Sequence, residues 1–344
     1  MSDSKALAPG SGGPLVEVDD LAVRFTTHDL DISVVNGVSF ALDRGQVLCL
    51  LGESGSGKSV TMRALMRLFP ETARLSGRIA IDGIDVLSLR DEQMRAVRGS
   101  LVSMIFQEPM TAFDPVFTIG TQIAETIVYH DGVSFGDANK RALELLELVQ
   151  VPSPKRRLAA YPHELSGGLR QRAMIALALA CRPKLLLADE PTTALDATVQ
   201  IQVLLLLREL QRELGMATIF VTHDLGVACE VADQIAVMYA GRFVETGAVA
   251  DVIDHPRHPY TQGLLRSTVH GGMRGEPLDS IPGSPPDLAD LPPGCSFAPR
   301  CTAAREICLG EMPTLFPLDA GQTARCFQYQ PGLRFDATSA LKAS

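Results

Sequence analysis

The stretch GESGSGKS, residues 52–59, constrains the fold of this chain more than any other. It fits the pattern G-x-x-x-x-G-K-[ST], with the apolar run QVLCLL before it and the helically spaced TMRALMRLF after it. Such a strand–loop–helix turns backbone N–H groups and the positive end of a helix toward a bound phosphate. We expect an α/β fold whose phosphate loop is formed by Gly52, Ser54, Gly55, Ser56 and Gly57, with Lys58 reaching the β- and γ-phosphates and Ser59 ligating Mg²⁺.

A second buried strand ends in two carboxylates. The run LLLADE, residues 185–190, is apolar until Asp189 and Glu190. Ligands of α/β sheets bind at the carboxyl ends of the strands, so these side chains are expected at the nucleotide. Acidic residues at the end of a strand often only mark the point where the chain reaches solvent. Beside a phosphate loop, however, they are the residues expected in phosphoryl transfer. Asp189 would hold Mg²⁺, and Glu190 would orient or deprotonate the attacking water.

Strand and helix patterns alternate along most of the chain. Residues 15–89 show strand alternation between Gly and Asp turns, whereas residues 108–179 carry helical spacing. Two buried strands, KLLLAD and ATIFVTH, flank an amphipathic helix at 197–214 with Asp196 as its N-cap, and residues 235–247 read as a hairpin. This order predicts a mainly parallel sheet with helices on both faces.

Composition excludes some classes of partner and location. The chain has 344 residues and a formal charge of -9, which leaves no positive field for a phosphate backbone, so nucleic acid is not expected as a partner. Residues 1–14 contain no apolar signal segment and are expected to form a disordered tail, and no apolar run reaches the length of a membrane span. A cytosolic chain keeps its thiols reduced, so clustered cysteines indicate metal or redox chemistry.

A third motif leads to a known family. LSGGLRQR, residues 165–172, resembles the signature of the ATP-binding cassette (ABC) ATPases. The other marks of that family follow in order: Gln107 in MIFQEP, ALD at 194–196 after DEPTT, and His223 in FVTHD. The resemblance implies an ABC nucleotide-binding domain at 15–265, with a RecA-like core, an antiparallel β subdomain and a helical subdomain at about 108–179.

The resemblance also implies roles for individual residues. Gln107 would contact Mg²⁺ or the attacking water, His223 the γ-phosphate, and Phe25, in AVRF, would stack on adenine, with an ordinary core position as the alternative for Phe25. The signature residues Ser166, Gly167 and Gly168 precede an apolar helix and offer a second anion-binding N-terminus. In the family this signature, with Asp196 nearby, closes over nucleotide held by another cassette. The resemblance therefore implies a second ATPase subunit.

Longer segments narrow the resemblance to the ATPases of dipeptide and oligopeptide importers in the peptide/nickel group. They are YPHELSGG at 161–168, FQEPMTAFDPVFTIG at 106–120, HPRHPYTQGLL at 255–265 and IPGSPPDLADLPPGCSFAPRC at 281–301. The group implies two membrane permeases, a second ATPase that could be a different chain, an extracytoplasmic substrate-binding protein, and a place at the cytoplasmic face of the bacterial inner membrane. One departure, TAFDP where relatives read closer to TSLNP, leaves the cargo open among peptides, nickel and glutathione.

Other readings remain as alternatives. A DNA-repair ABC ATPase would carry a long coiled coil, a ribosome-acting one usually two cassettes, and an exporter generally lacks this tail; a sensor retaining a cassette would not need intact Glu190. His255 and His258 could be read as metal ligands, but the proline after each prevents a regular helix that would align them.

Four of the seven cysteines lie in the region after residue 266, which is predicted to be an irregular C-terminal extension at 266–344. Five, six and seventeen residues separate Cys295, Cys301, Cys308 and Cys326, unlike the tight pairs of structural zinc sites. The resemblance to cluster-bearing dipeptide-importer ATPases implies a [4Fe-4S] cluster held by all four, with zinc or free reduced thiols as alternatives. The other three cysteines, Cys49, Cys181 and Cys229, lie in apolar segments and are expected to be buried.

Overall fold

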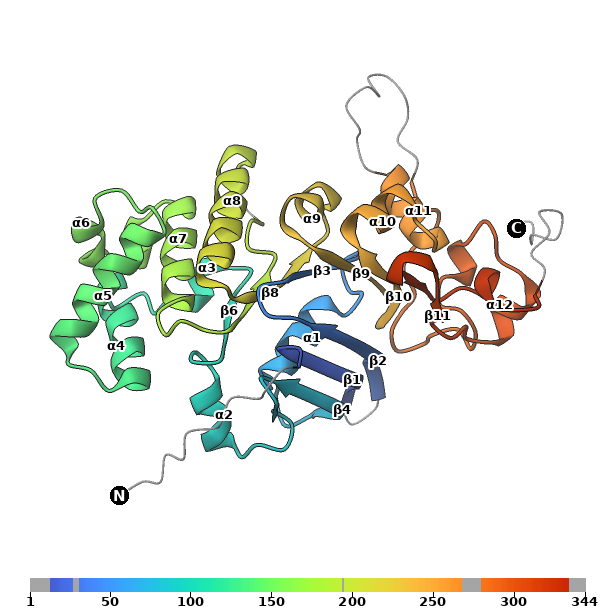
Figure 1. Ribbon diagram of the computed structural model, residues 1–344, viewed down its shortest axis with the longest axis horizontal. Helices are drawn as coiled ribbons and strands as arrows, with labels where there is room; N and C mark the ends of the chain where they lie inside the picture. The colour runs from blue at the N-terminus through green and yellow to red at the C-terminus, as the bar shows by residue number, and fades with distance from the viewer. Residues whose placement is uncertain (1–12, 27–30, 194, 268–279, 334–344) are drawn as a thin grey trace.

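The computed structural model describes residues 13–26, 31–193, 195–267 and 280–333. The predicted tail at 1–14 lies outside this part of the chain except for Gly13 and Pro14, and so does Ala194 of the ALD motif. Two sheets form the centre of the molecule, with helices to one side and the C-terminal extension to the other (Figure 1). None of the described helices is long and apolar enough to cross a membrane.

The larger sheet has the order β11-β12-β10-β9-β3-β8-β7-β6. Its parallel part consists of β9 (Gln234–Tyr239), β3 (Val47–Leu51), β8 (Ala217–Thr222), β7 (Leu185–Asp189) and β6 (Val102–Ile105). Every residue of β3, β7 and β8 is buried, as expected of strands with both faces covered. The predicted hairpin is confirmed, because β10 (Arg242–Ala248) pairs antiparallel with β9.

The smaller sheet is antiparallel and confirms the strand pattern predicted before residue 90. Its order is β2 (Asp31–Leu42), β1 (Val16–Thr26), β4 (Ala73–Ile81) and β5 (Ile84–Asp85). Helix α1 (Lys58–Leu65) follows the phosphate loop, and its Met62 and Leu65 lie in one core with residues of both sheets. Helix α2 (Asp91–Val97) packs into the same core through Met94 and Val97.

The region predicted to be helical, 108–179, is helical. It contains α3 (Pro109–Ala112), α4 (Ile119–Asp131), α5 (Phe135–Leu148), α6 (Pro154–Leu158) and α7 (Gly167–Ala178), which share one apolar core with α8 (Ala197–Leu214). As predicted, Asp196 caps α8, its carboxylate accepting from Val199 N–H at 3.0 Å, and Gly215 ends the helix in the left-handed region at φ 61°.

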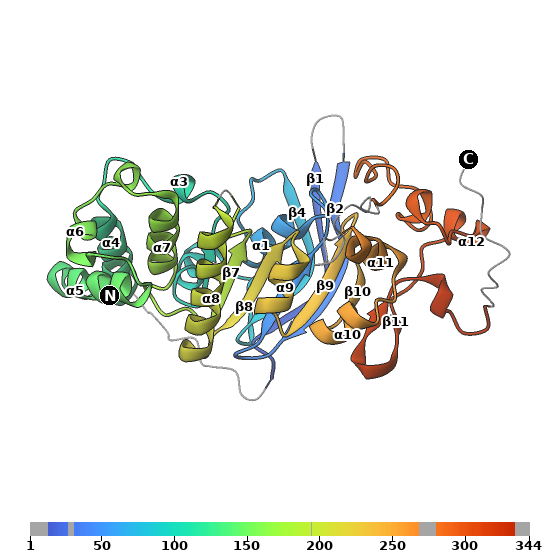
Figure 2. The ribbon, with the colours of Figure 1, turned by 90° about the horizontal axis from the view of Figure 1, so that it is seen from above.

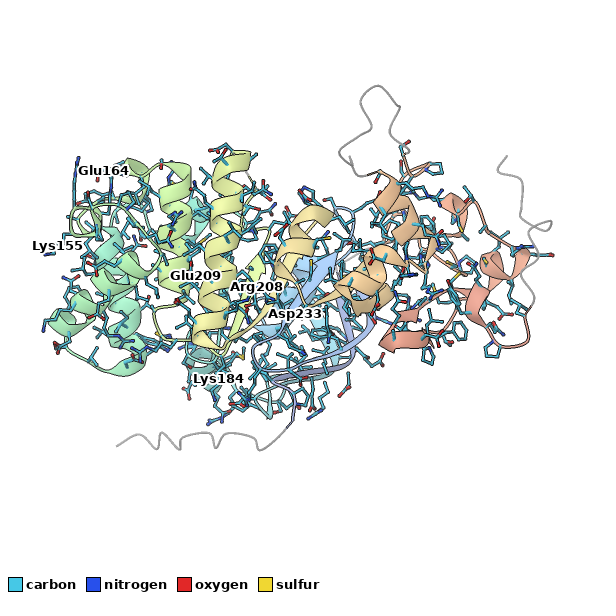
Figure 3. The ribbon with its side chains drawn as sticks, turned by 45° about the horizontal axis from the view of Figure 1, so that its top comes forward. Lys155, Glu164, Lys184, Arg208, Glu209 and Asp233 are labelled. Atoms are coloured by element: carbon cyan, nitrogen blue, oxygen red, sulfur yellow. The ribbon has the colours of Figure 1, made fainter. Side chains whose placement is uncertain are left out.

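Ion pairs tie the helices to the sheets. Arg208, on α8, donates to Asp233, just before β9, with 2.6 Å between nitrogen and oxygen; both residues are labelled in Figure 3. Asp82, after β4, pairs with Lys184, just before β7, at 2.6 Å and also with Arg44. Asp82 is 5% exposed, so these pairs link the antiparallel sheet to β7, the strand that ends at Asp189.

The C-terminal part of the chain extends the large sheet. Helices α9 (Leu225–Val231), α10 (Val249–Asp254) and α11 (Pro259–Arg266) precede it, and the predicted boundary at 266 falls at the end of α11. The extension was expected to be irregular, but two short strands, β11 (Phe316–Pro317) and β12 (Thr323–Ala324), add to β10 at the edge of the sheet. Figure 2 shows this part beside β10, with α12 (Glu306–Gly310) at its far side.

His258 has a structural role at the start of α11. Its Nδ1 accepts from Tyr260 N–H at 3.1 Å, and the ring is buried at 2% exposure. This cap agrees with the preference for a structural over a metal-binding role at this position.

Candidate nucleotide site

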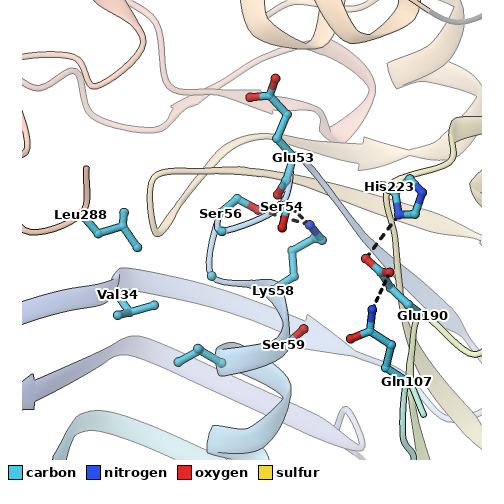
Figure 4. A pocket seen from close by; sticks show the side chains of 13 residues that line it. Val34, Glu53, Ser54, Ser56, Lys58, Ser59, Gln107, Glu190, His223 and Leu288 are labelled. Atoms are coloured by element: carbon cyan, nitrogen blue, oxygen red, sulfur yellow. Dashed lines mark hydrogen bonds and ion pairs between the residues drawn. The ribbon is translucent and has the colours of Figure 1, made fainter. Parts of the chain in front are cut away.

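A cavity of about 690 Å³ lies over the phosphate loop. Residues 53–60 of the loop and α1 line it, together with Gln107, Glu190 and His223, as Figure 4 shows. The structure thus brings together the residues predicted from four separate motifs. A cavity of this size is within the range of sites for small molecules and cofactors.

Two glycines of the loop are required by close packing. A Cβ on Gly52 would lie 2.2 Å from the backbone oxygen of Met238, and one on Gly57 would lie 2.9 Å from the oxygen of Val34. Gly57 also has φ 105° and is the N-cap residue of α1. These positions accept no side chain, so the loop lies close against the sheet and the N-terminus of α1 faces the cavity.

Lys58 is held inside the loop. Its Nζ donates to the backbone oxygens of Gly52 and Glu53 at 2.7 and 2.8 Å, and the residue is 5% exposed. Burial lowers the pKa of Lys58, against the opposing effect of the nearby carboxylates of Glu190 and Asp189. A buried ammonium group placed in this way is poised to exchange a carbonyl partner for a phosphate oxygen.

Ser59 and Asp189 are in contact. The Ser59 hydroxyl donates to Asp189 Oδ1 at 2.8 Å, which links the start of α1 to the end of β7. Burial raises the pKa of Asp189, whereas the Ser59 hydrogen bond opposes that shift. A hydroxyl and a carboxylate are hard oxygen ligands suited to Mg²⁺, which binds few protein groups and completes its shell with phosphate oxygens and water.

Glu190, which lines the cavity, is the centre of a group of polar side chains. Its carboxylate accepts from Gln107 Nε2 at 3.2 Å and from the Thr193 hydroxyl at 2.9 Å, and it lies 3.3 Å from His223 Nδ1. The backbone of Glu190 has φ 44°, a left-handed conformation that is uncommon for residues other than glycine and recurs at functional sites. The side chain is 17% exposed, so water can reach it without surrounding it.

Other predicted site residues are not in this cavity. Ser166 and Gly167 are exposed and begin α7, and the exposed Asp196 begins α8; neither group lines the cavity with Lys58. Phe25 lies on β1 with its ring 5.6 Å from that of Phe69, edge to face, and does not line the cavity either. Its stacking on adenine stays a prediction, as does the contact of the signature with a second cassette's nucleotide.

Four cavity residues were not predicted from the sequence: Glu53 and Val60, which adjoin predicted loop residues, and Val34 and Leu288. Val34 of β2 and Leu288 of the Pro-rich segment provide apolar side chains on the side of the phosphate loop away from Glu190 (Figure 4). Val34 could have been proposed from its place on a strand beside the loop. Leu288 is separated from the loop by more than two hundred residues, and no local motif marks it.

The four late cysteines line a separate small pocket. Cys295, Cys301, Cys308 and Cys326 surround a space of about 20 Å³ together with the rings of Phe297 and Phe327. Burial raises the pKa of Cys301 to about 11 and that of Cys326 to about 12, so both thiols are protonated at neutral pH. Among the described residues, no three or more His, Cys, Asp or Glu side chains are arranged to hold a metal ion.

The prediction for the remaining cysteines is partly wrong. Cys49 is buried in β3, but Cys181 is only partly buried and Cys229 is exposed. Cys229 lies on α9, whose buried face is formed by Leu225, Val227, Ala228 and Val231. An apolar stretch of sequence therefore did not reveal which face of this helix the thiol occupies.

Comparison with known proteins assigns the chain to a class. A family model described as "ABC transporter" matches residues 35–193, and one described as "Oligopeptide/dipeptide transporter, C-terminal region" matches residues 244–308. The dimeric ATP-binding cassette MJ0796 bound to ADP and Pi has a similar fold, with a TM-score of 0.61 and 28% identity over 68% of this chain and 98% of that one. These findings confirm the expected ABC ATPase fold.

Relatives matched over most of their length indicate to which group of ABC ATPases the chain is similar. The chain is 45% identical to the oligopeptide transport ATP-binding protein OppD of Salmonella typhimurium, over 95% of this chain and 98% of that protein. It is 46% identical to OppD of Bacillus subtilis, over 96% of this chain and 93% of that protein. The chain belongs to the ABC transporter family, as an ATPase subunit with the oligopeptide/dipeptide-type C-terminal region.

Proposed function

We propose that this protein is the ATP-hydrolysing subunit that drives import of dipeptides or oligopeptides across a bacterial inner membrane. The observation that carries the proposal is the cavity lined by Lys58, Ser59 and Glu190, with Asp189 hydrogen-bonded to Ser59. The match of residues 244–308 to the C-terminal region of peptide transporters supports the cargo class, as do the peptide-transport relatives. Nickel or glutathione is the alternative cargo within the group.

The geometry supports a division of labour around ATP. The phosphate loop and Lys58 would bind the phosphates, and Ser59, Asp189 and Gln107 would hold Mg²⁺, which neutralises charge on the β- and γ-phosphates. The carboxylate of Glu190 would accept a proton from the attacking water or orient that water. Gln107 and His223, both in contact with Glu190, would hold the carboxylate and meet the γ-phosphate.

The exposed signature supports a second cassette as partner. Ser166, Gly167 and Gly168 lie at the N-terminus of α7, outside the cavity of their own chain, where their N–H groups can face another nucleotide. The similar cassette MJ0796 is dimeric in its solved structure. Closure of two cassettes on ATP and their release after hydrolysis would give the movement that a transporter needs.

The remaining partners follow from the proposed role. The segment after Gln107 exposes Met110, Val116 and Phe117, which suit contact with membrane permeases. Two permeases would hold the protein at the cytoplasmic face of the membrane, and an extracytoplasmic binding protein would deliver the peptide.

We propose further that the four late cysteines ligate a [4Fe-4S] cluster. A zinc ion would need its thiolates within about 2.3 Å of one point, whereas a cluster spreads its ligands over four irons. The four described cysteines line one apolar pocket, which supports a ligand shared by all of them, with zinc or free reduced thiols as the alternatives. The thiols would lose their protons on binding.

Transport by the assembled complex tests the cargo. The complex of this chain with its second ATPase, permeases and binding protein would be placed in vesicles, and uptake of a labelled dipeptide, labelled glutathione and nickel compared. Peptide uptake that requires ATP and is lost with Glu190→Gln supports the proposal. Uptake of nickel or glutathione alone would assign another cargo.

Metal analysis tests the cysteine site. Protein purified without oxygen is expected to contain about four irons and four sulfides per chain, and Cys301→Ser and Cys326→Ser to lower both. Cys229→Ser, an exposed cysteine outside the pocket, serves as the matched control. Stoichiometric zinc without iron, or neither metal, would contradict the cluster.

A further inference from the structure

An arginine of the extension contacts the phosphate loop. Arg300 Nη1 donates to Glu53 Oε2 at 2.7 Å, and Nη2 donates to Glu53 Oε1 at 3.0 Å. Glu53 is the second residue of GESGSGKS, and 247 positions separate it from Arg300. This bidentate pair joins the cysteine-bearing extension directly to the loop that binds phosphate.

The Arg300 guanidinium group has further contacts with a backbone oxygen and two aromatic rings. Arg300 Nε donates to the oxygen of Pro282 at 2.9 Å, and the guanidinium carbon lies 5.8 and 6.0 Å from the ring centres of Tyr239 and Phe297. The Arg300 side chain is 5% exposed and that of Glu53 27% exposed. A charge fixed and desolvated in this way orients its partner more strongly than a surface pair does.

Glu53 transmits this restraint to Lys58. The Glu53 N–H donates to the Tyr260 hydroxyl at 2.9 Å, while its backbone oxygen accepts from Lys58 Nζ at 2.8 Å. All three polar groups of Glu53 are therefore hydrogen-bonded. Arg300 binds the carboxylate and Tyr260 the N–H, and both residues follow the parallel strands in the chain. Moving the carboxylate would rotate the peptide groups next to Gly52 and displace the carbonyl that places Lys58.

We infer that Arg300 is a positioning residue for the phosphate loop, acting on nucleotide affinity through Glu53. The inference rests on the proposed phosphate-binding role of Lys58 and goes beyond it, because it assigns part of the nucleotide site to the extension. Leu288 agrees with this assignment, since it also belongs to the extension and lines the cavity over the phosphate loop.

The test measures MgADP binding by calorimetry on the full chain. Arg300→Met is expected to raise Kd about tenfold, the weight of one hydrogen bond to a charged group, and Arg300→Lys to raise it less. Glu53→Gln is expected to weaken binding in the same direction. The Glu53→Gln/Arg300→Met double variant should bind no more weakly than Arg300→Met, because both changes break one interaction.

Controls separate positioning from folding and from failure of the site. Arg266→Met removes an exposed arginine of α11 and should leave Kd unchanged. The melting temperature of each variant shows whether it folds; if Arg300→Met does not, the partly exposed Glu53→Gln carries the test. Lys58→Ala should lose binding in every case, and normal binding by it would refute the site and the inference with it. Lost binding in Lys58→Ala alongside wild-type affinity in Arg300→Met and Glu53→Gln would overturn the role of Arg300 alone.

Discussion

Replacing Glu190 by Gln should separate nucleotide binding from hydrolysis. The amide keeps the size of the side chain and one oxygen able to accept a hydrogen bond from Gln107 or Thr193. It cannot take a proton from water. Because a positioned general base contributes about 10²–10⁴-fold, turnover should fall by that factor, equivalent to about 3–5 kcal/mol of activation free energy.

The affinity of the Glu190→Gln variant for MgATP should not fall as its turnover does. The negative charge of Glu190 lies close enough to Lys58 to act on its pKa, and it would repel a γ-phosphate bound at that lysine. Glu190→Gln should therefore bind MgATP at least as tightly as the wild type. ATPase activity is measured on the vesicle-bound complex and binding on the full chain, with exposed Glu230→Gln as control. Turnover above a tenth of the wild-type rate would refute the role of Glu190 as base.

Three further substitutions test the fold that supports the site. Gly52→Ala should unfold the loop region or cost at least about 1–3 kcal/mol, because its Cβ would overlap a backbone oxygen of β9; chemical denaturation measures the loss. Asp196→Ala should lower the free energy of unfolding by about 1 kcal/mol through loss of the α8 cap, seen as a lower melting temperature. Asp82→Asn should cost on the order of 1 kcal/mol, because Arg44 and Lys184 are half exposed. Burial raises the pKa of Asp82, but Lys184 and Arg44 lower it by more, so the pKa lies below its ordinary value of 3.8. The stability difference between wild type and Asp82→Asn should therefore be present at neutral pH and shrink as the pH falls below 3.8. Unfolding curves of the wild type and the variant measure it.

Local sequence motifs and periodicity predicted the phosphate loop and the elements around the nucleotide site well. The glycines and Lys58 form a contiguous motif, and the caps and periodicity of residues 197–214 match α8 from its first residue to its last. Even the meeting of Gln107, Glu190 and His223 could be expected, because each follows a buried parallel strand and the ends of such strands converge.

Contacts made by the extension could not be predicted in this way. Strands β11 and β12 contain two residues each, too few for an alternating pattern. Arg300 and Leu288 reach the loop by long-range packing, which leaves no local periodicity or spacing in the sequence. The sequence shows that Arg300 lies between Cys295 and Cys301, but it does not indicate that Glu53 is the partner of Arg300.

The position of Arg300 also predicts that the cysteine pocket and the nucleotide site influence each other. Arg300 is the last residue of a turn, Ala298–Arg300, and Cys295 and Cys301 flank it; Ala298 N–H donates to Cys295 O at 2.9 Å. A ligand on these thiols would fix the turn and hence the guanidinium group. Protein carrying metal in the pocket should therefore bind MgADP more tightly than metal-free protein, and by linkage MgADP should slow removal of that metal by a chelator to a corresponding degree. Arg300→Met should abolish both effects, because it removes the connection while leaving the thiols in place. Equal MgADP affinity with and without the metal would show that the turn positions Arg300 without a ligand on the cysteines. The cysteines would then affect only the structure of the extension.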